Sequence, residues 1–288
     1  MKPLYLPMLA QTAEPFDHAD YEFAVKWDGV RALAAVEPRG WRLWGRTGTD
    51  YTARYPELAV LRSLPAGTVV DGEVVVLRKG RANFPALLRR HQRRRPLPAA
   101  WVNQDLVVSY VLFDLLVERG RSLLQEPLRQ RRTRLRDLLA GVTAPLVYSD
   151  GVVGQGREFF AQVVAQGHEG VLAKHLASHY LPGKRSSSWR KIKPASVQPC
   201  VLVGYRAGRH GVHSVLLATL RQGALGYVGQ LSRGFSAEVR VTLAQRLETL
   251  HRAQPVVPCP QRASWIEPVV SGYCTSTPKQ FAVGANVR

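Results

Sequence analysis

The residues with the clearest chemical potential are a lysine at a strand end and the charged motifs that follow it. Lys26 begins the motif KWDGVR. Five companion motifs follow in order: GRTG at 45–48, DGE at 71–73, FD at 113–114, EGVLAK at 169–174 and WRKIK at 189–193. A lone lysine at a strand end is usually a solvated surface residue, but a lysine whose pKa is lowered is also a nucleophile. The ordered series, and not the lysine alone, indicates chemistry at Lys26.

The order KxDGxR, RxG, DGE, FD, EGxxxK, KxK resembles the motif series of the covalent nucleotidyltransferase superfamily. The segments SYVLFDLLVERGRSLLQEPLRQRR and EGVLAKHLASHYLPGKRSSSWRKIKP are similar to the ATP-dependent DNA ligases of bacteria, in particular the ligase module of end-joining ligase D and its stand-alone relatives. This similarity spans nearly the whole chain. It implies a DNA ligase that seals nicks between a 5′-phosphate and a 3′-hydroxyl through a lysyl-AMP intermediate, in DNA repair or replication. It also implies ATP and Mg²⁺ or Mn²⁺ as cofactors and nicked double-stranded DNA as the substrate.

The same resemblance implies a role for each matched residue. Lys26 is expected to be the catalytic nucleophile and Phe113 to stack on the adenine. A lysine must lose its proton before it attacks ATP, so nearby cations that lower its pKa from about 10.4 suit this chemistry. Lys174 is either a further phosphate contact or a surface lysine. The nucleotide-binding residues implied by the resemblance are Arg31, Arg46, Glu73, Phe113, Lys191 and Lys193, and the metal ligands are Glu73 and Glu169.

Two features depart from the family pattern. Ala24 stands two residues before Lys26, where the relatives carry a Glu that accepts a hydrogen bond from the adenine amino group. The C-terminal segment TSTPKQFAVGANVR has no clear copy of the basic motif that orients pyrophosphate, for which Lys279 or Arg288 is a candidate substitute. We therefore hypothesise that charging with ATP is slow relative to sealing by the charged protein.

Other functions share parts of this pattern. RNA ligases and mRNA-capping guanylyltransferases use the same lysine motif, but WRKIKP counts against capping and YVGQLSRGFS against an RNA ligase. A catalytically decayed DNA end-binding module would not need an intact Lys26, Glu73 and Glu169. An NAD-dependent ligase is disfavoured because the three cysteines form no cluster.

The resemblance implies an α+β fold in two domains: an adenylation (nucleotidyltransferase) domain of antiparallel sheets and helices over 1–194, and a C-terminal OB-fold β-barrel over 195–288. The element pattern agrees. YEFAVKWDGVRALAAV and TVVDGEVVVL are typical of strands, and PLRQRRTRLRDLLAGV and EFFAQVVAQGHEG of helices. After Pro194 the pattern changes to short strands with one helix, AEVRVTLAQRLETL.

The composition indicates a polyanionic partner. The 288 residues include 40 Lys and Arg against 21 Asp and Glu, a formal net charge of +19. Such an excess favours phosphate contacts, with a solvated basic face as the alternative, and the densest runs are 78–95 and 119–136.

We read the three cysteines as reduced and find no signal peptide or membrane span. We expect a cytoplasmic, nucleoid-associated monomer without a membrane partner, and an end-joining complex is a candidate protein partner.

Overall fold

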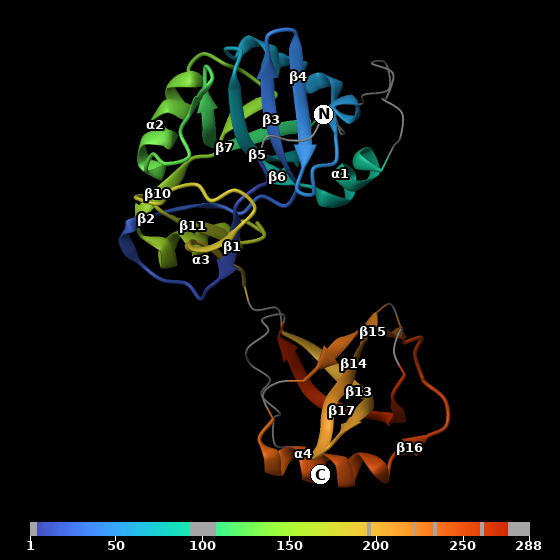
Figure 1. The fold of residues 1–288 in the computed structure, drawn as a ribbon. Coiled ribbons are helices and arrows are strands. Elements are labelled where there is room, and N and C mark those ends of the chain that lie inside the picture. Colours follow the sequence, from blue (N-terminus) through green and yellow to red (C-terminus); the bar gives the residue numbers. More distant parts are fainter. Residues whose placement is uncertain are drawn as a thin grey trace. The chain divides into compact units, whose positions relative to one another are not determined.

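The chain divides into two compact units, residues 1–194 and 195–288 (Figure 1). The computed structural model describes residues 5–92, 108–194, 197–221, 223–232, 235–259 and 262–275. Among the helices within these ranges, none is both long and apolar enough to cross a membrane. The C-terminal residues Lys279 and Arg288, and the basic positions 93–95, lie outside the described residues.

The larger unit contains two sheets whose strands are mostly antiparallel. The small sheet has five strands, in the order β1 (Leu9–Thr12), β12 (Arg185–Ile192), β11 (Val171–His175), β2 (His18–Val25) and β10 (Gly151–Gly154). The large sheet has the order β4 (Gly40–Gly45), β3 (Val30–Glu37), β5 (Thr68–Arg78), β7 (Val108–Glu118) and β8 (Arg121–Ser122), with β6 (Arg81–Ala82) beside β5 and β9 (Leu146–Tyr148) beside β7. A core of Met8, Leu33, Phe113, Trp189 and their neighbours joins residues of both sheets.

The predicted strand run over 21–36 is divided between these two sheets. β2 ends at Val25 in the small sheet, and β3 begins at Val30 in the large sheet. The four residues KWDG therefore form the crossing from one sheet to the other, and the sheets fix the position of Lys26 from both sides.

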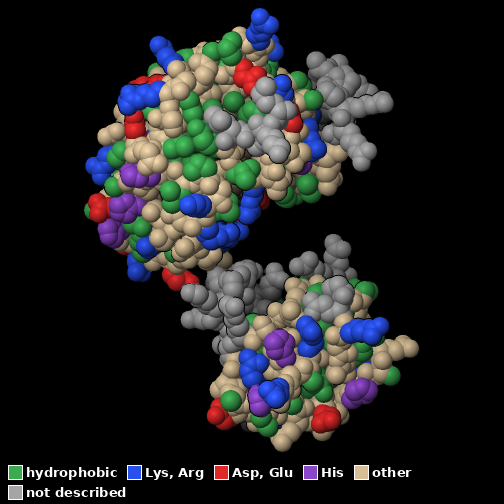
Figure 2. Space-filling model, viewed as in Figure 1, with side chains coloured by type: hydrophobic (Ala, Val, Ile, Leu, Met, Phe, Trp, Pro, Cys, Tyr) green, Lys and Arg blue, Asp and Glu red, His purple; other side chains and the backbone are tan. Residues whose placement is uncertain are grey.

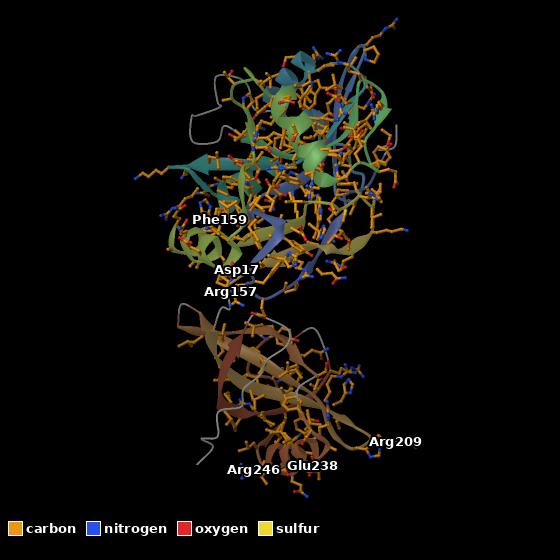
Figure 3. All side chains as sticks on the ribbon, turned by 90° about the vertical axis from the view of Figure 1, so that its left-hand side faces the viewer. Asp17, Arg157, Phe159, Arg209, Glu238 and Arg246 are labelled. Carbon is orange, nitrogen blue, oxygen red and sulfur yellow. The ribbon has the colours of Figure 1, made fainter. Side chains whose placement is uncertain are left out.

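Helices cover the outer faces of the sheets (Figure 1). Those against the large sheet are η1 (Thr52–Arg54), η2 (Pro56–Ser63), α1 (Phe84–His91) and α2 (Leu128–Leu138). α3 (Gly156–Ala165) packs through Val163 against the small sheet, and Asp17 caps its first turn by accepting a hydrogen bond from the Arg157 amide at 2.8 Å (Figure 3). The helices predicted near 128–139 and 158–167 are present as α2 and α3.

The arginine-rich run 119–136 is in part internal, which corrects its interpretation as a phosphate-contacting surface. Arg131 and Arg132 on α2 are buried, and they pair with Asp114 and Glu22 at 2.8 Å each. Arg134 pairs with Glu118 and Glu126. A buried charge requires a partner, so Arg131 and Arg132 hold α2 to both sheets and are not available to a polyanion.

The smaller unit is an OB-fold lobe built on one antiparallel sheet. Its strand order is β15 (Ala224–Leu231), β14 (Gly211–Arg221), β13 (Val197–Gly208), β17 (Ser264–Thr275) and β16 (His251–Arg252). β13 pairs with both β14 and β17, and α4 (Ala237–Glu248) enters between β15 and β16 in the chain. α4 carries Glu238 in its first turn and Arg246 in its last, which suits the helix dipole (Figure 3). Cys200 on β13 is disulfide-bonded, so the prediction that all cysteines are reduced is wrong.

Candidate active site

The turn between β2 and β3 presents Lys26 through close backbone contacts. The Lys26 amide donates to the Gly170 carbonyl at 2.8 Å. Gly29 lies so close to β5 that a Cβ atom at this position would be 2.3 Å from the Val74 carbonyl oxygen. A Cβ on Gly170, whose φ is +142°, would lie 2.2 Å from the Ile192 carbonyl oxygen. Both glycines are therefore needed for the backbone to bring Lys26 beside EGVLAK and WRKIK.

Two lysines share one carboxylate at this point. Glu169 forms an ion pair with Lys26 through one oxygen and with Lys193 through the other. Burial alone would raise the pKa of the Glu169 carboxyl, but hydrogen bonds from Lys193 and Lys26 outweigh burial and lower that pKa. Burial and the nearby Glu169 charge raise the pKa of Asp28, against the effect of Lys26 and Lys193. The cluster therefore holds cationic and anionic groups within reach of the Lys26 amine.

A cavity of about 270 Å³ opens beside Lys26 within the larger unit. Eight lining residues are ones for which the sequence suggested a role: Lys26, Arg31, Arg46, Glu73, Phe113, Lys174, Lys191 and Lys193. Glu169 does not line it but contacts two of the lining lysines. The structure thus brings the predicted site residues together at one cavity. Lining residues that the motifs did not single out for a role are Met8, Leu9, Ala10, Ala24, Val25, Trp27, Ser149, Leu172, Arg185 and Trp189.

Arg31 is held in a fixed orientation at the cavity wall. Its Nε and Nη2 atoms donate to the two Asp71 oxygens, each at 2.6 Å, in a bidentate pair. The Tyr180 hydroxyl donates to Asp71 at 2.6 Å and accepts from the Met8 amide at 2.9 Å. The guanidinium lies 4.5 Å from the centre of the Phe113 ring. Asp71, the first residue of DGE, therefore positions an arginine, a role that the motif alone did not predict.

Two lining groups have strongly shifted pKa values. Burial raises the pKa of the Glu73 carboxyl to about 8, against the neighbouring charges of Arg31 and Lys26. Burial, reinforced by the charge of Arg132, lowers the pKa of Lys174 to about 7. The Lys174 ammonium lies 4.0 Å from the Phe113 ring centre and 4.4 Å from that of Trp189, and the residue is 2% exposed. Lys174 is therefore a buried cavity residue, and its alternative as a surface lysine is wrong.

Lys191 and Arg46 add positive charge at the cavity. Partial burial, and then the charges of Arg185 and Lys193, lower the pKa of Lys191. Arg46 follows β4 and is exposed at the cavity edge. Clustered cations of this kind suit the oxygens of a polyphosphate.

The carboxylates near Lys26 are too few to bind a divalent cation without other ligands. Within the described residues, no group of three or more His, Cys, Asp or Glu side chains could hold a metal ion by itself. In nucleotide sites Mg²⁺ is usually bound by one or two carboxylates together with phosphate oxygens. Glu73 and Glu169 therefore fit a cation that binds with a nucleotide, and they do not form a complete protein site.

Comparisons with known proteins match both units. A family model described as "ATP dependent DNA ligase domain" matches residues 7–193, and one described as "ATP dependent DNA ligase C terminal region" matches residues 208–277. The chain is 35% identical over 266 residues to "Multifunctional non-homologous end joining DNA repair protein LigD" of Mycobacterium tuberculosis, covering 89% of this chain and 33% of that protein. It is 30% identical over 262 residues to "DNA ligase 1" of Korarchaeum cryptofilum, covering 85% of this chain and 48% of that protein. The chain thus spans about a third of the length of its LigD relatives.

Solved structures agree with these relatives. The structure titled "mycobacterial DNA ligase D complexed with ATP and MES" is 32% identical and matches with a TM-score of 0.59, covering 92% of this chain and 86% of that one. The ligase domain of M. tuberculosis LigD is 33% identical, with a TM-score of 0.58 and the same coverage. The similarity therefore extends over both units.

Proposed function

The chain belongs to the family of ATP-dependent DNA ligases, and we propose that it seals nicks between a 5′-phosphate and a 3′-hydroxyl in double-stranded DNA, with ATP as the AMP donor. The observation that carries this proposal is the cavity at which Lys26 lies beside the cations Lys191 and Lys193 and the ring of Phe113. That set combines a nucleophile, groups that neutralise phosphate and an aromatic surface for a base. DNA repair is the process we infer, since LigD relatives carry that description.

In the first step the Lys26 amine attacks the α-phosphorus of ATP. A nitrogen–phosphorus bond forms, the bond from the α-phosphorus to the bridging oxygen breaks, and pyrophosphate leaves with the electron pair. The amine must first separate from Glu169 and give up a proton. Lys191, Lys193 and Arg46 neutralise the phosphate oxygens as charge develops on them. The chain therefore supplies positioning and positive charge, which is what phosphoryl transfer requires.

In the second and third steps AMP moves to the DNA and is released. The 5′-phosphate oxygen of the nick attacks the phosphorus of lysyl-AMP, so the nitrogen–phosphorus bond breaks and Lys26 recovers its proton. The 3′-hydroxyl then attacks the activated 5′-phosphate, which forms the phosphodiester and expels AMP. Arg31, fixed by Asp71, is placed to hold phosphate or ribose oxygens during these steps.

We propose Glu73 and Glu169 as the residues that hold Mg²⁺ or Mn²⁺ together with phosphate oxygens. Such a cation, when bound, would supply charge neutralisation at the transferring phosphate. Both carboxylates are hard oxygen ligands, so the donor set supports this assignment.

The substrate class is supported by charge as well as by family. The formal net charge is +19, and Lys and Arg side chains are spread over the visible faces of both units (Figure 2). Arg131 and Arg132 on α2 are internal, as are Arg90, which pairs with Glu57, and Lys174, so phosphate contacts with DNA fall to the exposed Lys and Arg side chains. Both matching family models describe DNA ligases, which favours DNA over the RNA ligase and capping alternatives. The assembled cavity favours an active enzyme over a decayed end-binding module.

Covalent labelling tests the proposal. The purified chain is incubated with a divalent cation and α-labelled ATP, or in parallel with labelled GTP or NAD, and is then separated under denaturing conditions. We expect label from ATP, loss of label in Lys26→Ala, and sealing of a nicked duplex by the wild type. Label from GTP would instead support capping chemistry, and no label from any donor would overturn the proposal.

A further inference from the structure

We propose that the Ser149 hydroxyl is the group that recognises the edge of the nucleobase in this chain. The inference rests on the proposed function, because it assumes that ATP occupies the cavity beside Lys26. It assigns base selectivity to a residue outside the motif series. It also addresses Ala24, whose side chain has no polar atom with which to contact the adenine amino group.

Ser149 is fixed beside Phe113 at the cavity wall. Ser149 is one of the residues that line the cavity, and it is 3% exposed. The Ser149 amide donates to the Leu112 carbonyl at 2.8 Å, next to Phe113 on β7. Arg132 donates to the Ser149 carbonyl at 2.6 Å and to the Phe113 carbonyl at 3.4 Å. One buried guanidinium therefore holds both residues, and a base stacked on Phe113 would have Ser149 near its edge.

The Ser149 hydroxyl retains unused hydrogen-bonding capacity at a residue that lines the cavity. Its oxygen accepts a hydrogen bond from the Trp27 indole nitrogen at 3.2 Å, and this is its partner within the described part of the chain. A serine hydroxyl donates one hydrogen bond and accepts two. One O–H donor and one lone pair thus remain for a ligand. Trp27 fixes the oxygen from one side and leaves these two functions unused.

The chemistry of the other lining side chains assigns them to different parts of a nucleotide. Lysines and arginines suit phosphate and ribose oxygens, and Glu73 is an acid that suits a cation or ribose hydroxyl. Leu172 and Val25 are apolar. A purine edge is neutral and carries donors and acceptors together, which a hydroxyl can match in both directions. Ser149 is the neutral hydroxyl among the described lining residues.

The first experiment measures self-adenylation at varied ATP concentration for the wild type, Ser149→Ala and a matched control, Ser178→Ala. Ser178 is a suitable control because it is also buried and its carbonyl also accepts from an α2 arginine, Arg131, at 2.9 Å, but it does not line the cavity. Loss of one neutral hydrogen bond predicts a KM for ATP about 3- to 10-fold higher in Ser149→Ala. The maximal rate should stay the same, as should both constants in Ser178→Ala. If Ser149→Ala does not fold, Ser149→Cys replaces it, because a thiol is similar in size to the hydroxyl but forms only weak hydrogen bonds.

A second experiment compares ATP analogues, which separates contact with the base from a structural role. Purine riboside triphosphate lacks the exocyclic amine, and 1-deaza-ATP lacks the N1 acceptor. For the wild type, the KM of at least one analogue should be higher than the KM of ATP. For Ser149→Ala, the KM of that analogue and the KM of ATP should be equal. An unchanged KM in Ser149→Ala, or equal discrimination by wild type and variant against both analogues, would overturn the inference. Failure of the wild type to label with ATP would instead overturn the proposed function.

Discussion

The Lys26 ammonium forms an ion pair with Glu169, a residue 143 positions later in the chain. The contact lies beside the hydrogen bond from the Lys26 amide to the Gly170 carbonyl, so backbone and side chain align the same two segments. Glu169 also binds Lys193 from WRKIK. Three separate motifs therefore meet at one carboxylate.

Replacing this carboxylate should impair charging with AMP. Glu169→Gln removes the charge that positions Lys26 and Lys193, and it weakens a proposed ligand of the divalent cation. Because small misplacements of a reacting group are costly, we expect the rate of covalent labelling to fall by about 100-fold. The matched control is Glu158→Gln, on the exposed side of α3, which should label normally. Equal labelling rates in Glu169→Gln and the wild type would contradict the role assigned to this ion pair.

Lys174 should make the stability of the larger unit depend on pH in the alkaline range. Its pKa is lowered to about 7 in the folded chain, whereas an unfolded lysine titrates near its model value of 10.5. The unfolded state therefore binds more protons between these values, and the free energy of unfolding rises with pH across that window, by at most about 1.4 kcal/mol per pH unit. Lys174→Met removes this contribution, so the stability of the wild type relative to the variant should rise from pH 7 toward pH 10.

Urea denaturation followed by tryptophan fluorescence measures this difference, since five of the six tryptophans lie in residues 1–194. A constant difference between wild type and Lys174→Met at pH 7 and pH 9.5 would show that Lys174 titrates normally in the folded chain.

Gly29 should tolerate no side chain. The added methyl group of Gly29→Ala would meet the Val74 carbonyl oxygen at 2.3 Å, so the turn that carries Lys26 must shift. We expect a loss of about 1–3 kcal/mol in the free energy of unfolding, together with slower labelling. Gly40→Ala is the matched control, because a Cβ at that position has no atom within 4 Å. Comparable losses in the two variants would refute the close approach at Gly29.

The motif order allowed the site residues to be selected from the sequence, because a lysine, acids and cations in a fixed series limit the chemistry strongly. The structure places seven of them at one cavity, and the eighth, Glu169, pairs with two of the lining lysines. The α+β fold and the OB-fold lobe also followed from the resemblance, and the matched solved structures confirm both.

Other features depend on contacts that no local pattern reveals. The run 21–36 alternates like continuous strand, and its division between two sheets depends on the fit of Gly29 against β5. α1 was not predicted, although Asn83 caps it, because its eight residues are too few for a clear period. Arg131 and Arg132 looked like surface charge, since their acidic partners Asp114 and Glu22 are distant in sequence. Ser149 gave no signal at all, because a single serine after a short strand has no distinctive spacing.

The central claim is that AMP on Lys26 is an intermediate on the way to DNA. The most direct test isolates protein labelled with AMP, removes ATP, and adds a nicked duplex bearing either a 5′-phosphate or a 5′-hydroxyl. We predict that the label leaves Lys26 only with the 5′-phosphate duplex. It should appear first on the 5′ end of the nick and then, as the strand is sealed, as free AMP. Label that remains on the protein, or that is lost equally with both duplexes, would contradict the account.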